Sequence, residues 1–229
     1  MRASTAAVPP EVRAAAIARL ADELGDVELA AGVVAERGDE GLDGLLGGAG
    51  AAGAATTPRW AYTLSAVPLD TLDAVVVFAF GNRVDPDGTV APGPTNEALA
   101  RVTADLVAAR PMAVFAQWEV ARPLATEGGP GVVSIEPRVA DDGTVVYLST
   151  AGVAEAAVAL AAEAGVAPHR VGMLAVADHA RRAQLTARAV GLAADVPTGV
   201  ALPTSYDPDS GQPWTRDRHA YVLADLQGR

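Results

Sequence analysis

The sequence predicts an α/β protein with a buried, mostly parallel sheet, preceded by a small helical segment. Half of the 229 residues are hydrophobic, which excludes disorder over most of the length. Aromatic residues make up only 4%, so Ala and Val must supply most of the core. From about residue 73 onward, short Val-rich runs alternate with helical patterns. This alternation is typical of βαβ units, whose parallel strands are covered on both faces.

Two helices are expected before this pattern. A pair of prolines opens the first, at residues 9–25, and a weaker helix follows at residues 27–37. A Gly/Ala-rich run at residues 41–58 has few large side chains to pack, and we interpret it as a linker or mobile loop, with a helical continuation as the alternative. We therefore expect a helical extension with its linker at residues 1–57 and an α/β domain at residues 58–229.

Strands and helices alternate in the α/β domain. The strands are expected at residues 73–80, 111–118, 131–137, 169–178 and 196–203. The helices are expected at residues 95–110, 153–164, 179–190 and 212–227. Gly191 follows the third of these helices and is expected to end it, because glycine readily adopts the left-handed conformation common at this position.

Composition excludes several classes of function. The formal net charge is −11, so a nucleic-acid partner is not expected, because proteins bind phosphate backbones mainly through Lys and Arg. The chain has no lysine and no cysteine, which excludes Schiff-base, Walker-type and thiol chemistry. No apolar window approaches the roughly 18 residues of a membrane span. We expect a cytoplasmic protein without a membrane anchor.

Polar residues directly follow four of the expected strands. Ligands of open parallel sheets bind beyond the carboxyl ends of the strands, so these residues are candidates for ligand binding. They are Gly81, Asn82 and Arg83 after the first strand, Gln117, Trp118 and Glu119 after the second, Glu136 after the third, and Asp178, His179, Arg181 and Arg182 after the fourth. The alternative for each is a role in the turn alone, since turns favour Gly, Asn and Asp for backbone reasons.

The densest group of candidates lies at residues 176–184, where an Asp, a His and two Arg surround the start of the expected helix. The unpaired N–H groups and the dipole of a helix N-terminus attract anions, and Arg181 and Arg182 can reach the same space. Arg182 shares a helical stripe with Leu185 and Ala189, which we expect to face the sheet. The alternative is that both arginines are solvated or pair with local carboxylates.

Two residues are candidates for proton transfer. His179 is the only histidine at the end of an expected strand, and Glu119 follows an earlier strand. The turn at residues 81–88 lacks the G-x-G-x-x-G dinucleotide motif, and no Ser or Thr has the context of a nucleophile elbow. A metal site built from Asp178, His179, Glu119 and Glu136 is not expected, because these residues lack the spacing of ligand pairs.

From about residue 73 to the end, the motifs and their order resemble the YdcF/SanA/ElyC family. The most specific match is ADHARRA at residues 177–183, which resembles the His/Met-Arg-Arg-Ala turn that follows a strand in the family. Weaker matches are the strand ending at Gly81, Asp87-Gly88 with Arg101, QWEVA at residues 117–121, Ser149-Thr150 entering a helix, and Trp214.

This resemblance implies a Rossmann-like three-layer sandwich and adds Thr150 to the candidate ligand-binding residues. It also implies a nucleotide-like or phosphorylated ligand, S-adenosylmethionine being one proposed for the family. Members in the envelope carry membrane anchors, so this chain resembles the soluble branch.

Three functions compete at this point. The first is an enzyme, a transferase or hydrolase, that acts on a nucleotide-like or anionic small molecule. The second is a metabolite-binding regulatory or interaction module without turnover, whose N-terminal helices contact a partner or form a homodimer. The third is a structural accessory subunit, for which the polar groups at the strand ends would be unnecessary.

Overall fold

The computed structural model describes residues 8–38, 42, 64–126, 131–142 and 145–227. The chain divides into two units. Residues 1–63 and 217–229 make a helical unit, and residues 64–216 make an α/β unit. Each unit has its own apolar core, and the two cores share no residue.

The α/β unit is built on one six-stranded sheet in which all neighbouring strands are parallel. The strands, in the order in which they lie side by side, are β1 (Ala66–Val67), β10 (Ala194–Pro197), β9 (Val171–Leu174), β2 (Ala74–Val77), β5 (Ala113–Gln117) and β6 (Val132–Ile135). Every residue of β2, β9 and β10 is buried, as expected for strands covered on both faces.

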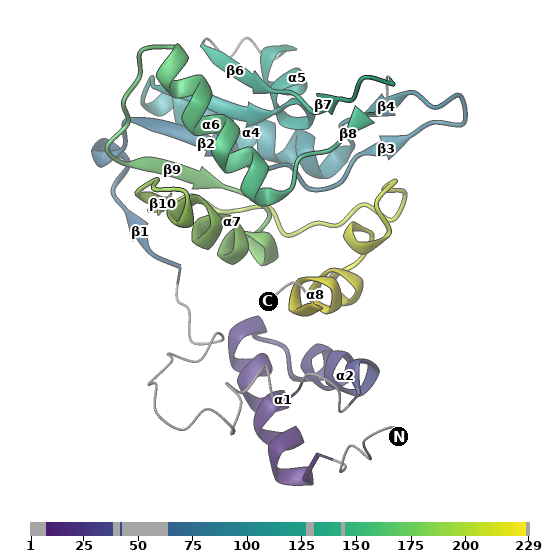
Figure 1. Cartoon of the computed structure of the whole chain (residues 1–229). Coiled ribbons are helices and arrows are strands. Elements are labelled where there is room, and N and C mark those ends of the chain that lie inside the picture. The colour runs from purple at the N-terminus through teal and green to yellow at the C-terminus, as the bar shows by residue number, and fades with distance from the viewer. Residues whose placement is uncertain (1–7, 39–41, 43–63, 127–130, 143–144, 228–229) are drawn as a thin grey trace. The chain divides into compact units, whose positions relative to one another are not determined.

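Helices cover both faces of this sheet (Figure 1). On one face, α6 (Thr150–Glu163) and α7 (Ala177–Ala189) place buried alanines in the same core as Phe115 and Met173. On the other face, α4 (Pro94–Ala109) and α5 (Trp118–Thr126) contact each other and lie behind the sheet in the view of Figure 1. The α/β class and the Rossmann-like three-layer arrangement are therefore confirmed.

The order of the strands reverses between β2 and β9. After β2 the chain builds β5 and β6 on one side, and it then returns to build β9 and β10 on the other side. β2 and β9 pair with Ala74 opposite Val171 and Val77 opposite Leu174. In open α/β sheets, ligands bind in the crevice beyond the carboxyl ends of the strands at such a reversal. The ends of β2 and β9 are therefore the expected position of a ligand site.

Most of the expected strands and helices are present, with shifted ends. The strand expected at residues 73–80 stops pairing after Val77, and the last strand lies at Ala194–Pro197 instead of 196–203. Gly191 has φ 92° just beyond the end of α7, and its N–H bonds the carbonyl of Arg188. This is the left-handed glycine expected at the end of a helix.

Several short elements are not visible in the sequence pattern. Two antiparallel hairpins are formed by β3 (Arg83–Val84) with β4 (Val90–Ala91) and by β7 (Arg138–Val139) with β8 (Val145–Val146). Strands of two residues are too short to show alternation. α5 was not expected either, because Pro123 lies inside it and an internal proline removes a helical hydrogen bond.

The helical unit begins with the two helices expected from the sequence. α1 (Pro10–Leu24) ends at Gly25, which has φ 65°, and α2 (Val27–Arg37) begins at Asp26. The Asp26 carboxylate accepts a hydrogen bond from the Leu29 N–H at 2.9 Å, which caps the second helix.

The expected terminal helix also belongs to the helical unit. This helix, α8 (Arg218–Gln227), was assigned from the sequence to the domain that begins at residue 58. In the structure its Val222 and Leu226 lie in one buried core with Leu20 and Val33, because their apolar stripe matches that of α1 and α2. The helical unit therefore joins the two ends of the chain.

Part of the expected domain organisation lies outside the described residues. This applies to the Gly/Ala-rich linker at 41–58, apart from the buried Leu42, and to the boundary at residue 57. Within the described part of the chain, no helix has both the length and the apolar character needed to cross a membrane.

Candidate functional site

The strand reversal brings His179, from the fourth group of candidate residues, next to the segment that follows β2. His179, in the first turn of α7, is 8% exposed. Its ring centroid lies 6.4 Å from that of Phe78 and 6.1 Å from that of Phe80, both of which follow β2. The histidine is therefore held in an aromatic setting at the ends of β2 and β9.

The segment after β10 crosses the same edge of the sheet. The hydroxyl of Tyr206 donates to the Asp178 carboxylate at 2.8 Å, and its ring lies 5.4 Å from Phe80 in an edge-on arrangement. The backbone of this segment also accepts the Ala177 N–H through Pro203 at 2.8 Å. Asp178 and the start of α7 are thus positioned by a segment from which the sequence predicted no site residue.

The Gly81 turn is packed against this segment as well. Gly81 has φ 72°, and a Cβ atom there would lie 2.5 Å from both Ser210 Oγ and Thr215 Oγ1. The two hydroxyl oxygens are themselves 2.7 Å apart. Ser210 and Thr215, and not a ligand, therefore occupy the space next to the Gly81 backbone.

Arg83 has a carboxylate partner in the same segment. Its guanidinium donates two hydrogen bonds of 2.8 Å to Asp207, which is buried, and a longer one of 3.3 Å to Asp209. The hydrogen bonds from Arg83 lower the pKa of the Asp207 carboxyl, and those to Asp207 raise the pKa of the Arg83 guanidinium. This bidentate salt bridge anchors the β3–β4 hairpin to the segment after β10.

Asn96, which sequence analysis missed, fixes the end of β2 from α4. Its side chain is fully buried, and its oxygen accepts the Phe80 N–H at 2.8 Å. Its nitrogen donates to the carbonyls of Gly81 at 2.8 Å and Pro92 at 2.7 Å. The only sequence feature that could have indicated Asn96 was an Asn in the first turn of a helix that begins with Gly-Pro. Asn is also common near helix starts as a simple cap, so this feature does not identify a buried bridging residue.

Two buried polar side chains near the ends of β2 and β5 lack complete hydrogen bonding. Glu119, in the first turn of α5, is 2% exposed, and Asn82 is 4% exposed. Neither Glu119 Oε2 nor Asn82 Nδ2 makes a hydrogen bond of good geometry within the described part of the chain. The two side chains do interact with each other, because the Asn82 amide lowers the pKa of the Glu119 carboxyl, but this contact leaves both groups incompletely satisfied. Buried polar atoms without partners are uncommon in folded proteins and call for an explanation.

Burial also changes the acidity of Glu119. Loss of solvent raises the pKa of the Glu119 carboxyl to about 7, and the charge of Glu136 adds to this rise. The nearby Asn82 amide and Arg122 act in the opposite direction without cancelling it. A carboxyl with a pKa near 7 exchanges protons readily at neutral pH.

The other candidates after β5 support this region in different ways. Gln117 Oε1 accepts the Ala79 N–H at 2.7 Å and so links the ends of β5 and β2. Trp118 is buried, and its Nε1 has no partner among the described residues. The Arg122 guanidinium lies 4.2 Å from the Trp118 ring centroid. The end of β5 therefore carries a further buried donor.

Glu136 and Thr150 are less closely connected to these groups. Glu136 is exposed and accepts a hydrogen bond from Ser134 at 2.7 Å. Thr150 is the half-buried first residue of α6, whose cap is Ser149. The structure thus gives Glu136 an electrostatic influence on Glu119 and places Thr150 at the start of α6.

The expected orientation of α7 is wrong in one respect. Leu185 is 37% exposed and Ala189 is exposed, so the stripe they share with Arg182 faces away from the sheet. The buried stripe contains Ala180, Ala183, Gln184 and Ala187. Small alanines let the helix lie close to the sheet. This close packing determines which side of α7 faces the sheet, and the larger Leu185 therefore faces away from it.

Arg181 and Arg182 are both half-buried at the start of α7. The Nε atom of Arg181 is removed from solvent. Both arginines lie in the second turn of α7, one turn after Asp178 and His179. Among the described residues, no group of three or more His, Asp or Glu side chains is arranged to hold a metal ion.

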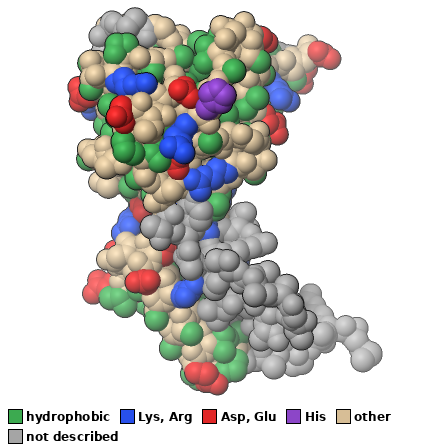
Figure 2. All heavy atoms as spheres, turned by 90° about the vertical axis from the view of Figure 1, so that its left-hand side faces the viewer, with side chains coloured by type: hydrophobic (Ala, Val, Ile, Leu, Met, Phe, Trp, Pro, Cys, Tyr) green, Lys and Arg blue, Asp and Glu red, His purple; other side chains and the backbone are tan. Residues whose placement is uncertain are grey.

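The opposite edge of the sheet, where the strands begin, has a different character. Figure 2 shows this face of the α/β unit, with acidic and basic side chains interspersed. Asp195, for example, pairs with Arg188 at 2.7 Å and with Arg170 at 3.6 Å. Comparison with known proteins adds no assignment: no protein-family model matches the chain, and no curated protein matches its sequence.

Proposed function

We propose that the α/β unit is an enzyme that binds a nucleotide-like or otherwise anionic metabolite at the carboxyl ends of β2, β5 and β9. The observation that carries this proposal is the pair Glu119 and Asn82, two buried side chains that interact with each other but leave Glu119 Oε2 and Asn82 Nδ2 without a well-formed hydrogen bond. Burying such atoms costs free energy unless another group completes their hydrogen bonds. A bound ligand at the strand ends would supply that group.

Glu119 is the residue best suited to move a proton in this site. Its pKa of about 7 lets it act as an acid or a base near neutral pH, and strongly shifted carboxyl groups are concentrated at functional sites. His179 is a second candidate, because it lies at the neighbouring end of β9. The reaction classes that fit are transfer and hydrolysis, neither of which needs a thiol or a lysine.

The start of α7 provides the charge that favours an anionic ligand. The positive end of the α7 dipole lies beyond the sheet and favours negative charge there, although the Ala177 and His179 N–H groups already donate to the carbonyls of Pro203 and Val176. Arg181 and Arg182, in the second turn of α7, add positive charge near this end of the helix that an anionic ligand can share. S-adenosylmethionine and phosphorylated nucleotides are the ligands suggested by the resemblance to the YdcF/SanA/ElyC family.

Ligand-induced stabilisation tests the placement of the site. Titration with S-adenosylmethionine and with ADP is expected to raise Tm by about 3 °C at ten times Kd for the ligand that binds. Arg182→Ala should abolish the rise, whereas Arg101→Ala, which removes an exposed guanidinium from α4, should leave it unchanged. A full response of Arg182→Ala to every ligand that stabilises the wild type would contradict this placement.

A binding module without turnover is the second candidate. The observation in its favour is the tight packing of Ser210 and Thr215 on Gly81, which occupies a turn that an enzyme would leave open to substrate. Glu119→Gln separates the two functions, because it keeps the side-chain shape and removes the titrating group. If the protein is an enzyme, this variant should bind like the wild type and stop converting the ligand, as measured by mass spectrometry. Equal conversion by both proteins would exclude Glu119 as the acid or base.

A further inference from the structure

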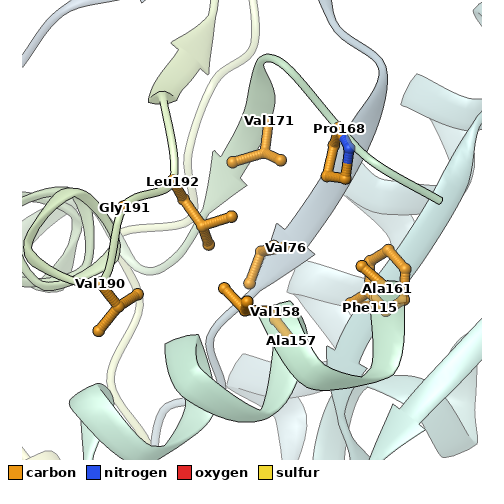
Figure 3. Close-up of a pocket in the computed structure, with 10 residues that line it drawn as sticks. All are labelled: Val76, Phe115, Ala157, Val158, Ala161, Pro168, Val171, Val190, Gly191 and Leu192. Atoms are coloured by element: carbon orange, nitrogen blue, oxygen red, sulfur yellow. The ribbon is translucent and has the colours of Figure 1, made fainter. Parts of the chain in front are cut away.

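A cavity of about 200 Å³ lies between α6 and the sheet, away from the strand ends discussed above. Val76 and Phe115, in the middle of β2 and β5, form its floor. Val171, the first residue of β9, borders it at the edge of the sheet where the strands begin. Leu192, just before β10, closes another side. Figure 3 shows these side chains around a common space. Every side chain that lines the cavity is apolar.

The sequence of α6 explains why this space is unfilled. Ala157 and Ala161 lie one turn apart and are 2% and 3% exposed, so both face the core. A leucine at either position would extend into the space. Gly191 at the end of α7 adds no side chain, because φ 92° favours glycine there. The cavity therefore results from small residues at three positions, two on α6 and one in the turn after α7.

The cavity is also accessible from the surface. Val158 is 39% exposed, and Gly191 and Pro168 are exposed and half-exposed at its border. No lining side chain carries a donor or acceptor, so any polar contact would have to come from the backbone. Water in this open cavity can hydrogen-bond only to backbone groups, and an apolar ring would displace it from the apolar side chains. The cavity walls lose the dispersion contacts that a close-packed core would make.

We propose that this cavity binds a small apolar molecule, or the apolar end of a metabolite, of about the size of one aromatic ring. A volume of about 200 Å³ is sufficient for such a group; an engineered apolar cavity of ~150 Å³ in another protein binds benzene. A ring between α6 and the sheet would restore the missing contacts with Phe115 and Val76. This cavity is independent of the proposed site at the carboxyl ends of β2, β5 and β9, because the cavity and that site share no residue.

Benzene is the direct probe of this proposal, and pyrazine, a polar ring of the same size, is the matched control. Benzene is expected to raise Tm of the full-length protein by about 3 °C at ten times its Kd. Pyrazine should raise it much less, because its two nitrogens would lose their water and find no donors among the lining side chains. Nuclear Overhauser contacts from benzene to methyl groups of Val76, Val171 and Leu192 would locate it in the cavity.

A pair of substitutions on α6 tests the location independently. Ala157→Met should fill the cavity and abolish the benzene response, whereas Ala159→Met, on the exposed side of the same helix, should preserve it. The wild-type Overhauser contacts decide the question even if Ala157→Met does not fold. No rise in Tm with saturating benzene, or contacts to methyl groups elsewhere, would overturn the proposal.

Discussion

At the scale of single residues, Gly81 shows why a residue chosen as a ligand contact can have a structural reason to be there. A glycine after a buried strand is expected where the backbone approaches another group closely. In the structure that group is the pair of hydroxyls from Ser210 and Thr215. These lie more than a hundred residues later in the chain, so no local pattern could reveal them.

Alanine substitutions at two glycines distinguish the free-energy cost of backbone strain from the cost of steric overlap at Gly81. Gly81→Ala and Gly88→Ala both place a side chain at positive φ, 72° and 84°, which costs about 1–2 kcal/mol from the backbone alone. A Cβ at Gly88 meets nothing within 4 Å, whereas one at Gly81 meets two hydroxyls at 2.5 Å. Urea unfolding should show Gly81→Ala to be less stable by about a further 1–3 kcal/mol. Equal stability of the two variants would contradict the observed packing.

The raised pKa of Glu119 predicts how stability changes with pH. The folded-state pKa of about 7 exceeds the ordinary value of 4.5, so the folded protein holds the proton more tightly than the unfolded chain. The free energy of unfolding should therefore fall as pH rises from about 4.5 to about 7 and stay low above that range. The full effect is on the order of 3 kcal/mol.

Unfolding in urea at pH 5 and pH 8 measures this effect. Glu119→Gln should lose most of the pH-dependent difference, because glutamine does not titrate. Glu155→Gln, an exposed position on α6, should behave like the wild type. If Glu119→Gln retains the wild-type dependence on pH, Glu119 does not carry the buried proton.

At the scale of elements, the orientation of α7 is the clearest difference from expectation. Hydrophobicity alone places Leu185 toward the sheet, but the structure buries Ala180, Ala183 and Ala187 instead. The helix can approach β9 and β10 closely only along its small residues. Such a preference depends on the distance between two layers, which a sequence pattern does not contain.

Two substitutions on α7 test this orientation. Ala183→Leu adds a large side chain where none fits, and we expect it to lower the free energy of unfolding by about 1–3 kcal/mol. Leu185→Ala removes a side chain that is 37% exposed and should cost less than about 1 kcal/mol. Chemical unfolding of both variants checks the order, and the reverse order would support the stripe that the sequence predicted.

Elements with a strong local signal were predicted well. The strands β2, β5, β6 and β9 are runs of Val and other apolar residues, and α1 and α4 have clear starts and apolar spacing. The same reasoning located Asn82, Glu119, His179 and Arg181 at strand ends. It could not find Asn96, Tyr206 or Asp207, because their importance depends on contacts between distant parts of the chain.

At the scale of the whole molecule, the chain forms two cores from three stretches of sequence. The core of the helical unit combines Leu20 and Val33 with Leu226 from the other end of the chain. The α/β unit is formed by the one continuous stretch Leu64–Arg216. Domain boundaries predicted from the sequence divide the chain into consecutive segments. Such a division does not reveal a unit built from both ends of the chain.

This division predicts how the two units behave in isolation. Residues 64–216 expressed alone should fold and unfold cooperatively, because their core is complete. Residues 1–63 alone should lose most of their helix content, because Val222 and Leu226 are missing from the small core that remains. Circular dichroism with urea unfolding measures both. A cooperative fold for residues 1–63 alone would show that α8 contributes little to the helical unit.

The most direct test of the central claim is the titration of the Glu119 carboxyl in the folded protein. Carbon-13 NMR of glutamate-labelled protein follows this group, and Glu119→Gln identifies its signal. A midpoint near pH 7 is the predicted result, as expected for a buried carboxyl ready to exchange a proton with a ligand. A midpoint near pH 4, like that of an exposed glutamate, would contradict the proposed role.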